Sequence, residues 1–394
     1  MDRLSHFVLF VCALALAGSA AAQSDSWEPV IDLRYRLELV DDDRFSEDAT
    51  ASTLRARLGV VSPEFSGWRF GLVGHANRHV GSEDFNSTAN GRTDYPVVAD
   101  PDDEHLSQAW IGYRANERFE ARIGRQRLIE DNVRFLGNVG FRQLEQTFDA
   151  ITLGWQPAED WQVDLRWLDK AHRVFGPSNP NPLLAEAELN AWMGTLTRDF
   201  GPVKSALYAH RIAFDDRPAS HRNLGLRLTG DLPGDQGFGY RVEFARQDGI
   251  RELDAVSGQN YIHLRLQQKL ERWHWFAGHE RLGGDGNYAF QMPLATLHAH
   301  NGWTDQFLTT PTDGLFDTYA AAGTTLGQWT GLVKLHDFRS DRDSRSYGRE
   351  FGLMIKRPLV AGLSAEVKAA RFNGDSSNGH PDVTKVWFTL NGNW

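Results

Sequence analysis

Pairs of arginines separated by one residue are the features of this sequence with the clearest capacity for binding chemistry. Arg34 and Arg36 form one such pair, and Arg55 and Arg57 form another. Side chains of a β-strand alternate between its two faces, so this spacing puts both guanidinium groups of a pair on one face. A guanidinium group stays protonated and binds a carboxylate through two parallel hydrogen bonds. The spacing therefore predicts strand faces that bind carboxylate-bearing anions.

Basic residues continue on the same parity along most of the chain, opposite rows of apolar side chains. We count fifteen bases against eight acids on these faces, although the net charge is -10. The bases among them that we select as candidates to line a path for anions are Arg34, Arg36, Arg55, Arg57, Arg114, Arg122, Arg227, Arg265 and Lys385. The acidic surplus lies between the rows, as in Asp41–Asp43 and Asp100–Glu104. A structural interpretation stays open, in which arginines and acids neutralise each other across neighbouring strands.

The elements that must position these bases are strands. In the last stretch, residues 383–394, apolar and mostly polar positions alternate, and Trp394 is the final aromatic residue. Similar alternation recurs in about eighteen segments of roughly ten residues, the length that a tilted strand needs to cross a bilayer. The connections between the segments are alternately short and long. This arrangement is typical of a closed antiparallel transmembrane β-barrel with short periplasmic turns and long extracellular loops. The alternative is a secreted, soluble β-rich protein.

The first 22 residues differ in character from the rest. Arg3 and His6 precede an apolar run that ends before Ala20–Ala22, a pattern typical of a secretory signal peptide. The one cysteine, Cys12, lies inside this segment, so we expect no disulfide in the mature chain. We predict a signal peptide over residues 1–22 and one barrel domain over residues 23–394.

Two stretches resemble a known family. Residues 122–155, with Gly-Arg-Gln at 124–126, and residues 278–317, with Leu-His-Ala-His-Asn-Gly-Trp-Thr-Asp-Gln-Phe-Leu at 297–308, resemble the alginate-export family of bacterial outer-membrane barrels. The resemblance implies an eighteen-stranded barrel whose arginine-rich constriction passes a polyuronate. It also implies that Arg125, Arg134 and Arg142 belong to that constriction. Arg125 shares the parity of outward-facing Ile123, so this role requires a β-bulge at Gly124 or a strand that has already left the membrane.

Segment 283–314 is too long for a bare hairpin loop. It could fold inward and narrow a pore with Asn301, Trp303 and Asp305, or it could form an outer cap without a role in selectivity. His298 and His300 in this segment, and His274, His279 and Glu280 nearby, are interpreted as polar lining rather than as a metal site, and we expect no cofactor.

The leading hypothesis is an outer-membrane channel that passes an anionic, alginate-like polysaccharide through an arginine-rich lumen. The alternative in the same class is a porin that imports small acidic sugars or other anions. Expected partners are the solute, outer-membrane lipid and a periplasmic secretion scaffold, but no nucleic acid. Two other classes are considered: a barrel enzyme, which would need a catalytic His298 or His279 on one rim, and a secreted carbohydrate-binding protein.

Overall fold

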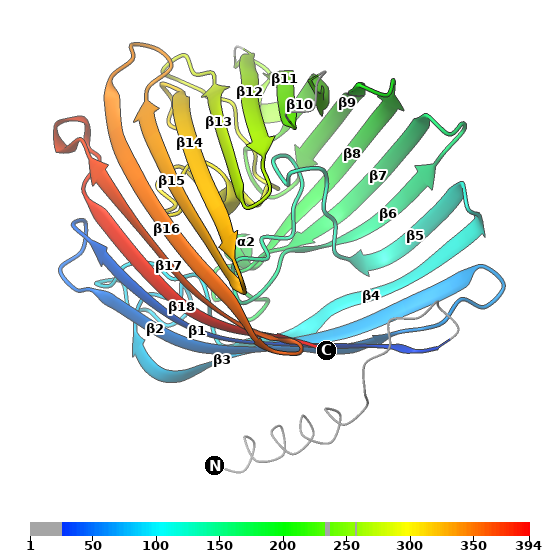
Figure 1. Ribbon diagram of the computed structural model, residues 1–394, viewed down its shortest axis with the longest axis horizontal. Helices are drawn as coiled ribbons and strands as arrows, with labels where there is room; N and C mark the ends of the chain where they lie inside the picture. The colour runs from blue at the N-terminus through cyan, green and yellow to red at the C-terminus, as the bar shows by residue number, and fades with distance from the viewer. Residues whose placement is uncertain (1–25, 233–236, 257) are drawn as a thin grey trace.

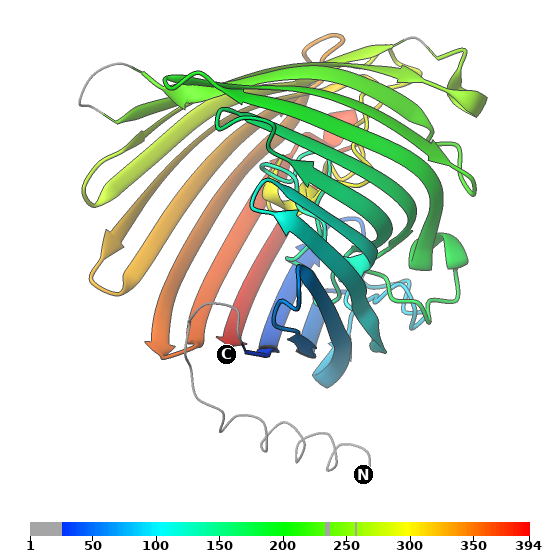
Figure 2. The ribbon, with the colours of Figure 1, turned by 90° about the vertical axis from the view of Figure 1, so that its right-hand side faces the viewer.

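The computed structural model describes residues 26–232, 237–256 and 258–394, so the predicted signal peptide lies outside the described residues. The described chain forms one antiparallel sheet of eighteen strands. The first strand pairs with the second and also with the last, from Asp32 opposite Asn393 to Asp42 opposite Val383. The sheet is therefore a closed barrel without free edges, as Figures 1 and 2 show. The predicted fold class is confirmed.

Each strand pairs with its neighbours in sequence. The strands are β1 (Glu28–Asp42), β2 (Ala49–Val61), β3 (Trp68–Asp84), β4 (Asp103–Asn116), β5 (Phe119–Gln126), β6 (Thr147–Trp155), β7 (Trp161–His172), β8 (Glu186–Asp199), β9 (Val203–Phe214), β10 (His221–Asp231), β11 (Phe238–Gly249), β12 (Gln259–Lys269), β13 (Trp273–Leu282), β14 (Leu315–Leu326), β15 (Trp329–Arg339), β16 (Ser346–Val360), β17 (Leu363–Gly374) and β18 (Val383–Asn393). The short helices are α2 (Pro182–Ala185) and the 3-10 turns Arg251–Leu253, Leu297–Ala299 and Ser376–Asn378.

The two faces of the wall differ as the alternation predicts. Leu224 and Leu226 on β10 are 58% and 44% exposed, whereas Arg55 on β2 is 4% exposed and faces inward. Tryptophans next to the short turns, including Trp155, Trp273 and Trp329, are about half exposed on the outside. Such a belt is typical of the level where a bilayer meets water. Among the described residues, no helix is long and apolar enough to cross a membrane.

The barrel interior holds a packed core. Phe135, Phe290 and Phe307 come from long connections, and they pack against inward-facing Tyr261 of β12 and Phe338 of β15. All five side chains are buried. The core thus lies inside the lumen and is built by connections that fold back into it.

Candidate substrate path

Two long loops meet inside the barrel. Loop A, residues 127–146, joins β5 to β6, and loop B, residues 283–314, joins β13 to β14. The backbone N–H of Gly137 donates to the carbonyl oxygen of Leu294, and that of Thr296 donates to the carbonyl oxygen of Val133, both at 3.0 Å. These bonds join the loops into one body across the lumen. Loop B therefore folds inward, which the sequence left open.

Two wall arginines hold loop A through its backbone. One terminal nitrogen of Arg34 donates to the carbonyl oxygens of Gly140 and Phe141 at 3.0 and 3.1 Å. Arg36 donates to the same carbonyl of Phe141 at 2.7 Å, and its guanidinium lies 4.2 Å from the centroid of the Phe141 ring. Among the described residues, neither arginine forms an ion pair, so the contacts anchor the loop without neutralising the charge.

Other predicted bases of the same wall are paired with acids. Arg55 binds Asp32 of β1, and Arg57 lies 3.1 Å from the same carboxylate. Arg57 also approaches Glu145 of loop A at 3.3 Å. For Arg55 and Arg57, the structure therefore agrees with the structural interpretation, in which arginines and acids neutralise each other.

The wall across the lumen holds loop A in a similar way. Arg227 of β10 lies 3.2 Å from Asp131 of loop A, and Arg241 of β11 binds the same carboxylate. Arg241 also lies 2.7 Å from Glu243 on its own strand. Burial opposes ionisation of Asp131, but the two arginines outweigh it and lower the pKa of this carboxyl. Loop A is therefore fixed between two cationic walls.

The two loop arginines implied by the family resemblance are buried where the loops meet. Arg134, which is 1% exposed, donates to Glu280 of β13 at 2.7 Å and to Asn301 of loop B at 2.8 Å. Arg142 lies 3.3 Å from Glu38 of β1 and 3.1 Å from Asp305 of loop B. Burial alone would lower the pKa of Arg142, but these carboxylates raise it above its ordinary value. Both guanidinium groups therefore remain charged.

Arg142, His298, Asp305, Lys368 and Lys385 form what we call the gate cluster. Asp305 accepts from His298 Nδ1 at 2.7 Å and from Arg142 at 3.1 Å, and Lys385 of β18 lies at 3.5 Å. Burial disfavours the charged form of Asp305, but the hydrogen bond from His298 and the charges of Lys385 and Arg142 hold the pKa of this carboxyl below its usual range. Burial lowers the pKa of His298, so the imidazole is neutral near pH 7. Its Nε2 then accepts a hydrogen bond from Lys368 of β17.

Aromatic rings surround the lysine of the gate cluster. The Lys368 ammonium lies 4.1 Å from the ring centroid of Phe141, 4.8 Å from that of Trp303 and 4.7 Å from that of Trp387. The His298 ring also stacks on Phe141, with centroids 3.4 Å apart. Cation–π contacts of this kind stabilise a desolvated ammonium group. Trp303 of loop B thus lies inside the lumen, against the wall.

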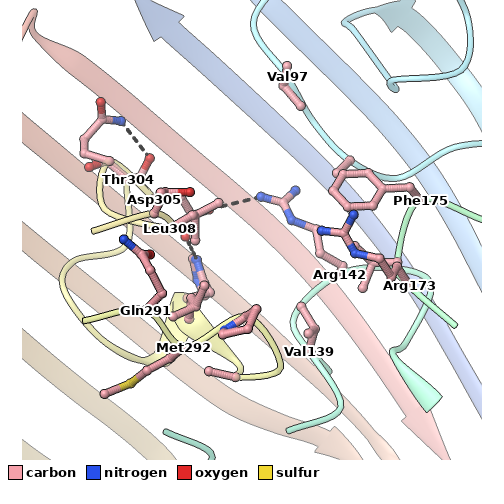
Figure 3. Close-up of a pocket in the computed structure, with 18 of the residues that line it drawn as sticks. Val97, Val139, Arg142, Arg173, Phe175, Gln291, Met292, Thr304, Asp305 and Leu308 are labelled. Atoms are coloured by element: carbon pink, nitrogen blue, oxygen red, sulfur yellow. Dashed lines mark hydrogen bonds and ion pairs between the residues drawn. The ribbon is translucent and has the colours of Figure 1, made fainter. Parts of the chain in front are cut away.

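A cavity of about 750 Å³ lies above the gate cluster, on the side of the long loops, and we call it the vestibule. Figure 3 shows Val97, Arg142, Arg173 and Phe175 on one side of it and Asp305 among the residues on the other. Apolar side chains form much of the remaining lining: Val139, Val174, Met292, Pro293, Leu297 and Leu308. The vestibule therefore combines apolar walls with cationic groups.

Arg173 is one of the basic residues that line the vestibule, together with Arg44, Arg142 and Lys385. Its guanidinium lies 4.8 Å from the Phe175 ring centroid and donates to the carbonyl oxygen of Leu183 at 2.9 Å. Burial, together with the nearby charge of Arg217, lowers the pKa of Arg173 to about 10, so the group is still protonated at neutral pH. No carboxylate of the described residues forms an ion pair with it.

Three predicted bases lie toward the short turns, away from the two loops. Arg122 of β5 lies over Trp110 at 4.1 Å, and Arg265 of β12 lies over Phe276 at the same distance. Arg114 of β4 lies 3.5 Å from Glu64 and is about half exposed. Their inward parity agrees with the prediction, and their role as lining stays a prediction.

The structure corrects the placement of Arg125. The pairing of β5 with β4 runs from Ala109 opposite Arg125 to Arg114 opposite Glu120 without a shift, so there is no bulge at Gly124. Arg125 therefore keeps the outward parity of Ile123, which is 55% exposed. It binds Asp149 at 2.9 Å. The inward position implied by the resemblance is wrong, because the register continues through Gly124, opposite Trp110, and the parity is not reset.

The histidines do not converge. His298 bonds Asp305, whereas the ring of His300 contacts the carbonyl oxygen of Asn132. His279 faces outward and contacts Thr318. Among the described residues, no group of three His, Cys, Asp or Glu side chains could hold a metal ion.

The sequence pattern predicts neither Arg173 as a lining residue nor the burial of loop A. Phe135, Leu136 and Leu144 of loop A are buried, whereas the alternation of short and long connections predicted extracellular loops at the long ones. Three large apolar residues in such a segment are a signal that it packs inside the barrel.

A closed eighteen-stranded barrel with an apolar exterior and a charged interior defines the class: this is a bacterial outer-membrane channel. The family model described as alginate export matches residues 29–295. The chain belongs to that family.

Solved structures with a similar fold are distant in sequence. OccAB2 of Acinetobacter baumannii is 15% identical, with a TM-score of 0.71, covering 95% of this chain and 99% of that one. OccK9 (OpdG) of Pseudomonas aeruginosa is 12% identical, with a TM-score of 0.74 and coverage of 94% and 99%. OpdK of P. aeruginosa, solved with vanillate, is 12% identical, with a TM-score of 0.71 and coverage of 93% and 98%. No curated protein sequence matches this chain.

Proposed function

We propose that this channel takes up small carboxylate-bearing solutes, single acidic sugars or aromatic acids, through the vestibule. A volume of about 750 Å³ suits one such solute at a time. The apolar walls would cover its ring, and Arg173 would bind its carboxylate. The position of the vestibule on the side of the long loops supports entry from outside.

The charges below the vestibule also favour an anion. Around the gate cluster, four cationic side chains (Arg34, Arg36, Arg142 and Lys385) face three carboxylates (Glu38, Asp100 and Asp305), and Lys368 is a further buried basic group. An excess of positive charge between low-dielectric walls attracts anions. A carboxylate would exchange water for guanidinium and ammonium partners in steps, and the acids would keep each site from binding it too tightly.

The observation that carries the proposal is the junction of the two loops across the lumen. Gly137 bonds Leu294 and Thr296 bonds Val133, so a polymer could pass only after both loops had moved. A small solute needs only local rearrangement of side chains.

The second candidate is export of a polyuronate, which the match to the alginate-export family favours. The same arginines could bind successive carboxylates of one chain. The two candidates differ in whether the joined loops must leave the lumen during transport.

Single-channel recording in planar bilayers tests the proposal. We expect an anion-selective pore in which galacturonate and vanillate cause brief current blocks and shift the reversal potential as permeant ions. A long polyuronate should give neither effect. A cation-selective pore, or passage of the polyuronate through the native protein, would refute the proposal.

A shortened loop B provides the matched variant. Replacing residues 295–305 with a Gly-Ser linker removes both the bond to Val133 and Asp305. We expect this variant to have a higher conductance than the native protein and to admit the polyuronate, which the native protein excludes. If the native protein already conducts the polymer equally well, the export candidate is correct.

A further inference from the structure

The lipid-facing side of the barrel has a groove over strands β13 to β17. It has a volume of about 570 Å³, and its lining is mainly apolar. Small outward residues, Ala277 of β13 and Ala320 of β14, face each other in the register, and Leu335 of β15 and Phe351 of β16 continue the same row. The two larger side chains are about half exposed on the outside. The small side chains of Ala277 and Ala320 therefore leave a depression in the outer surface, and the larger side chains of Leu335 and Phe351 border it.

Two arginines lie at the long-loop end of this groove. Arg339 ends β15, and Arg349 lies opposite Asp337, one row above Leu335 and Phe351 on the same face. Their side chains are 48% and 75% exposed. Both use Nε to bind the single carboxylate of Asp337, at 2.7 Å each. Among the described residues, their terminal nitrogens have no hydrogen-bond partner.

Sharing one carboxylate is not confined to this pair, since Arg222 of β10 and Arg246 of β11 both approach Asp248 through Nε. What distinguishes Arg339 and Arg349 is the groove beside them, which Arg349 lines. Other outward bases of the rim are more fully neutralised. Arg281 binds its own carboxylate, Asp341, through two nitrogens. Lys170 lies between two acids, Glu186 and Glu188. By contrast, two guanidinium groups on one carboxylate leave an excess positive charge with free donors that face outward.

We propose that this groove binds one phosphorylated, acylated glycolipid of the outer leaflet, with the chemistry of lipid A. The outer rim of the barrel lies at the level of the lipid head groups, and the hydrocarbon lies deeper. A phosphate monoester would accept hydrogen bonds from the terminal nitrogens of Arg339 and Arg349. One acyl chain would then run down the groove over Ala320, beside Leu335 and Phe351.

Native mass spectrometry of the delipidated full-length protein tests the assignment. The probes are bis-phosphorylated lipid A, its monophosphoryl form and phosphatidylethanolamine. We expect one copy of bis-phosphorylated lipid A to bind most tightly, followed by the monophosphoryl form. The double variant Arg339→Ala/Arg349→Ala should bind it at least about tenfold more weakly, since each charge-assisted hydrogen bond contributes strongly in a poorly hydrated site.

A second variant tests whether lipid A binding requires the groove as well as the two arginines. Ala320→Trp fills the groove and leaves both arginines intact, and it too should weaken lipid A binding. The matched controls are Arg222→Ala, which removes one of the two outward arginines that share Asp248 away from the groove, and Ala209→Trp, an outward alanine of β9. Neither control should change binding. Equal losses in the controls, or equal affinity for phosphatidylethanolamine, would overturn the assignment. Anion selectivity of the pore should be the same in all four variants, because these residues face away from the lumen.

Discussion

Replacing Asp305 with asparagine should release the two inserted loops from the barrel wall. Asp305 contacts Arg142, His298 and Lys385, and so links loop B to loop A and to β18. The amide of asparagine keeps nearly the same shape, but it carries no charge. The substitution therefore isolates the electrostatic part of the gate cluster.

The free-energy cost of Asp305→Asn depends on which ion pairs Arg142 and Lys385 keep in the variant. Removing one partner of a buried ion pair costs about 3–5 kcal/mol, because the other charge stays buried without a counterion. Arg142 retains Glu38 at 3.3 Å and Asp100 at 3.8 Å, and Lys385 loses the carboxylate it approaches. We therefore expect the low end of this range, about 3 kcal/mol, which corresponds to about a hundredfold change in the loop-opening equilibrium.

Hydrogen exchange measures this opening directly. The amides of Gly137 and Thr296 donate the bonds that join the loops, so both should exchange about a hundredfold faster in Asp305→Asn. Strand amides should be unaffected. Asp313→Asn is the matched control within loop B, because Asp313 pairs with the exposed Arg342 and Arg345. Pairs of this kind contribute at most about 1 kcal/mol. Unchanged exchange at Gly137 and Thr296 in Asp305→Asn would refute the role given to the gate cluster.

Three further outcomes are expected. Burial, followed by the charge of Arg134, lowers the pKa of His300 to about 3, whereas an opened loop would restore a value of about 6.5. The opened state then binds the proton more readily, so closure is favoured above pH 6.5 and weakens by about 2 kcal/mol by pH 5. Thr296 exchange, corrected for its intrinsic pH dependence, should rise accordingly, and His300→Gln should flatten the profile. Arg173→Gln should weaken current block by small carboxylates about tenfold, through loss of a charge-assisted hydrogen bond, while a neutral sugar of equal size should pass as before. Leu226→Arg, at the middle of outward-facing β10, should cost about 2–4 kcal/mol of folding free energy in vesicles, measured by denaturant titration. Leu226→Ala serves as its control, and equal stability of the two variants would mean that this face does not contact lipid.

The wall of the barrel could be predicted because lipid imposes a strict rule on every strand. Backbone groups must be paired, and alternate side chains must be apolar. Leu224 and Leu226 therefore indicated the outer face of β10, and Arg227 the inner face. The same rule required the last strand to pair with the first, as it does.

The interior could not be predicted in this way. Alternation states which face a side chain occupies, but not which partner it meets there. Arg34 anchors Gly140, which lies 106 residues away, and nothing in the local sequence of either segment indicates the contact. Arg125 shows the opposite case: its parity predicted the outer face correctly, and the family resemblance alone implied the lumen.

Under the proposed function, the contacts of Arg34 and Arg36 would allow a chain with a net charge of -10 to keep a cationic passage. Loop A needs a firm attachment to the wall, and ion pairs such as Arg57 with Glu145 supply one at the expense of charge. The carbonyl oxygens of Gly140 and Phe141 accept hydrogen bonds from guanidinium groups at distances similar to those of carboxylate oxygens. Unlike carboxylates, they carry no net charge. The same two arginines can therefore hold the loop and still attract an anion. Exchanging Phe141 for another residue should leave these backbone bonds in place, whereas exchanging Arg36 for leucine should lose both the attachment and part of the anion selectivity. A variant that lost selectivity while loop A kept its hydrogen-exchange protection would show that the two roles are separable.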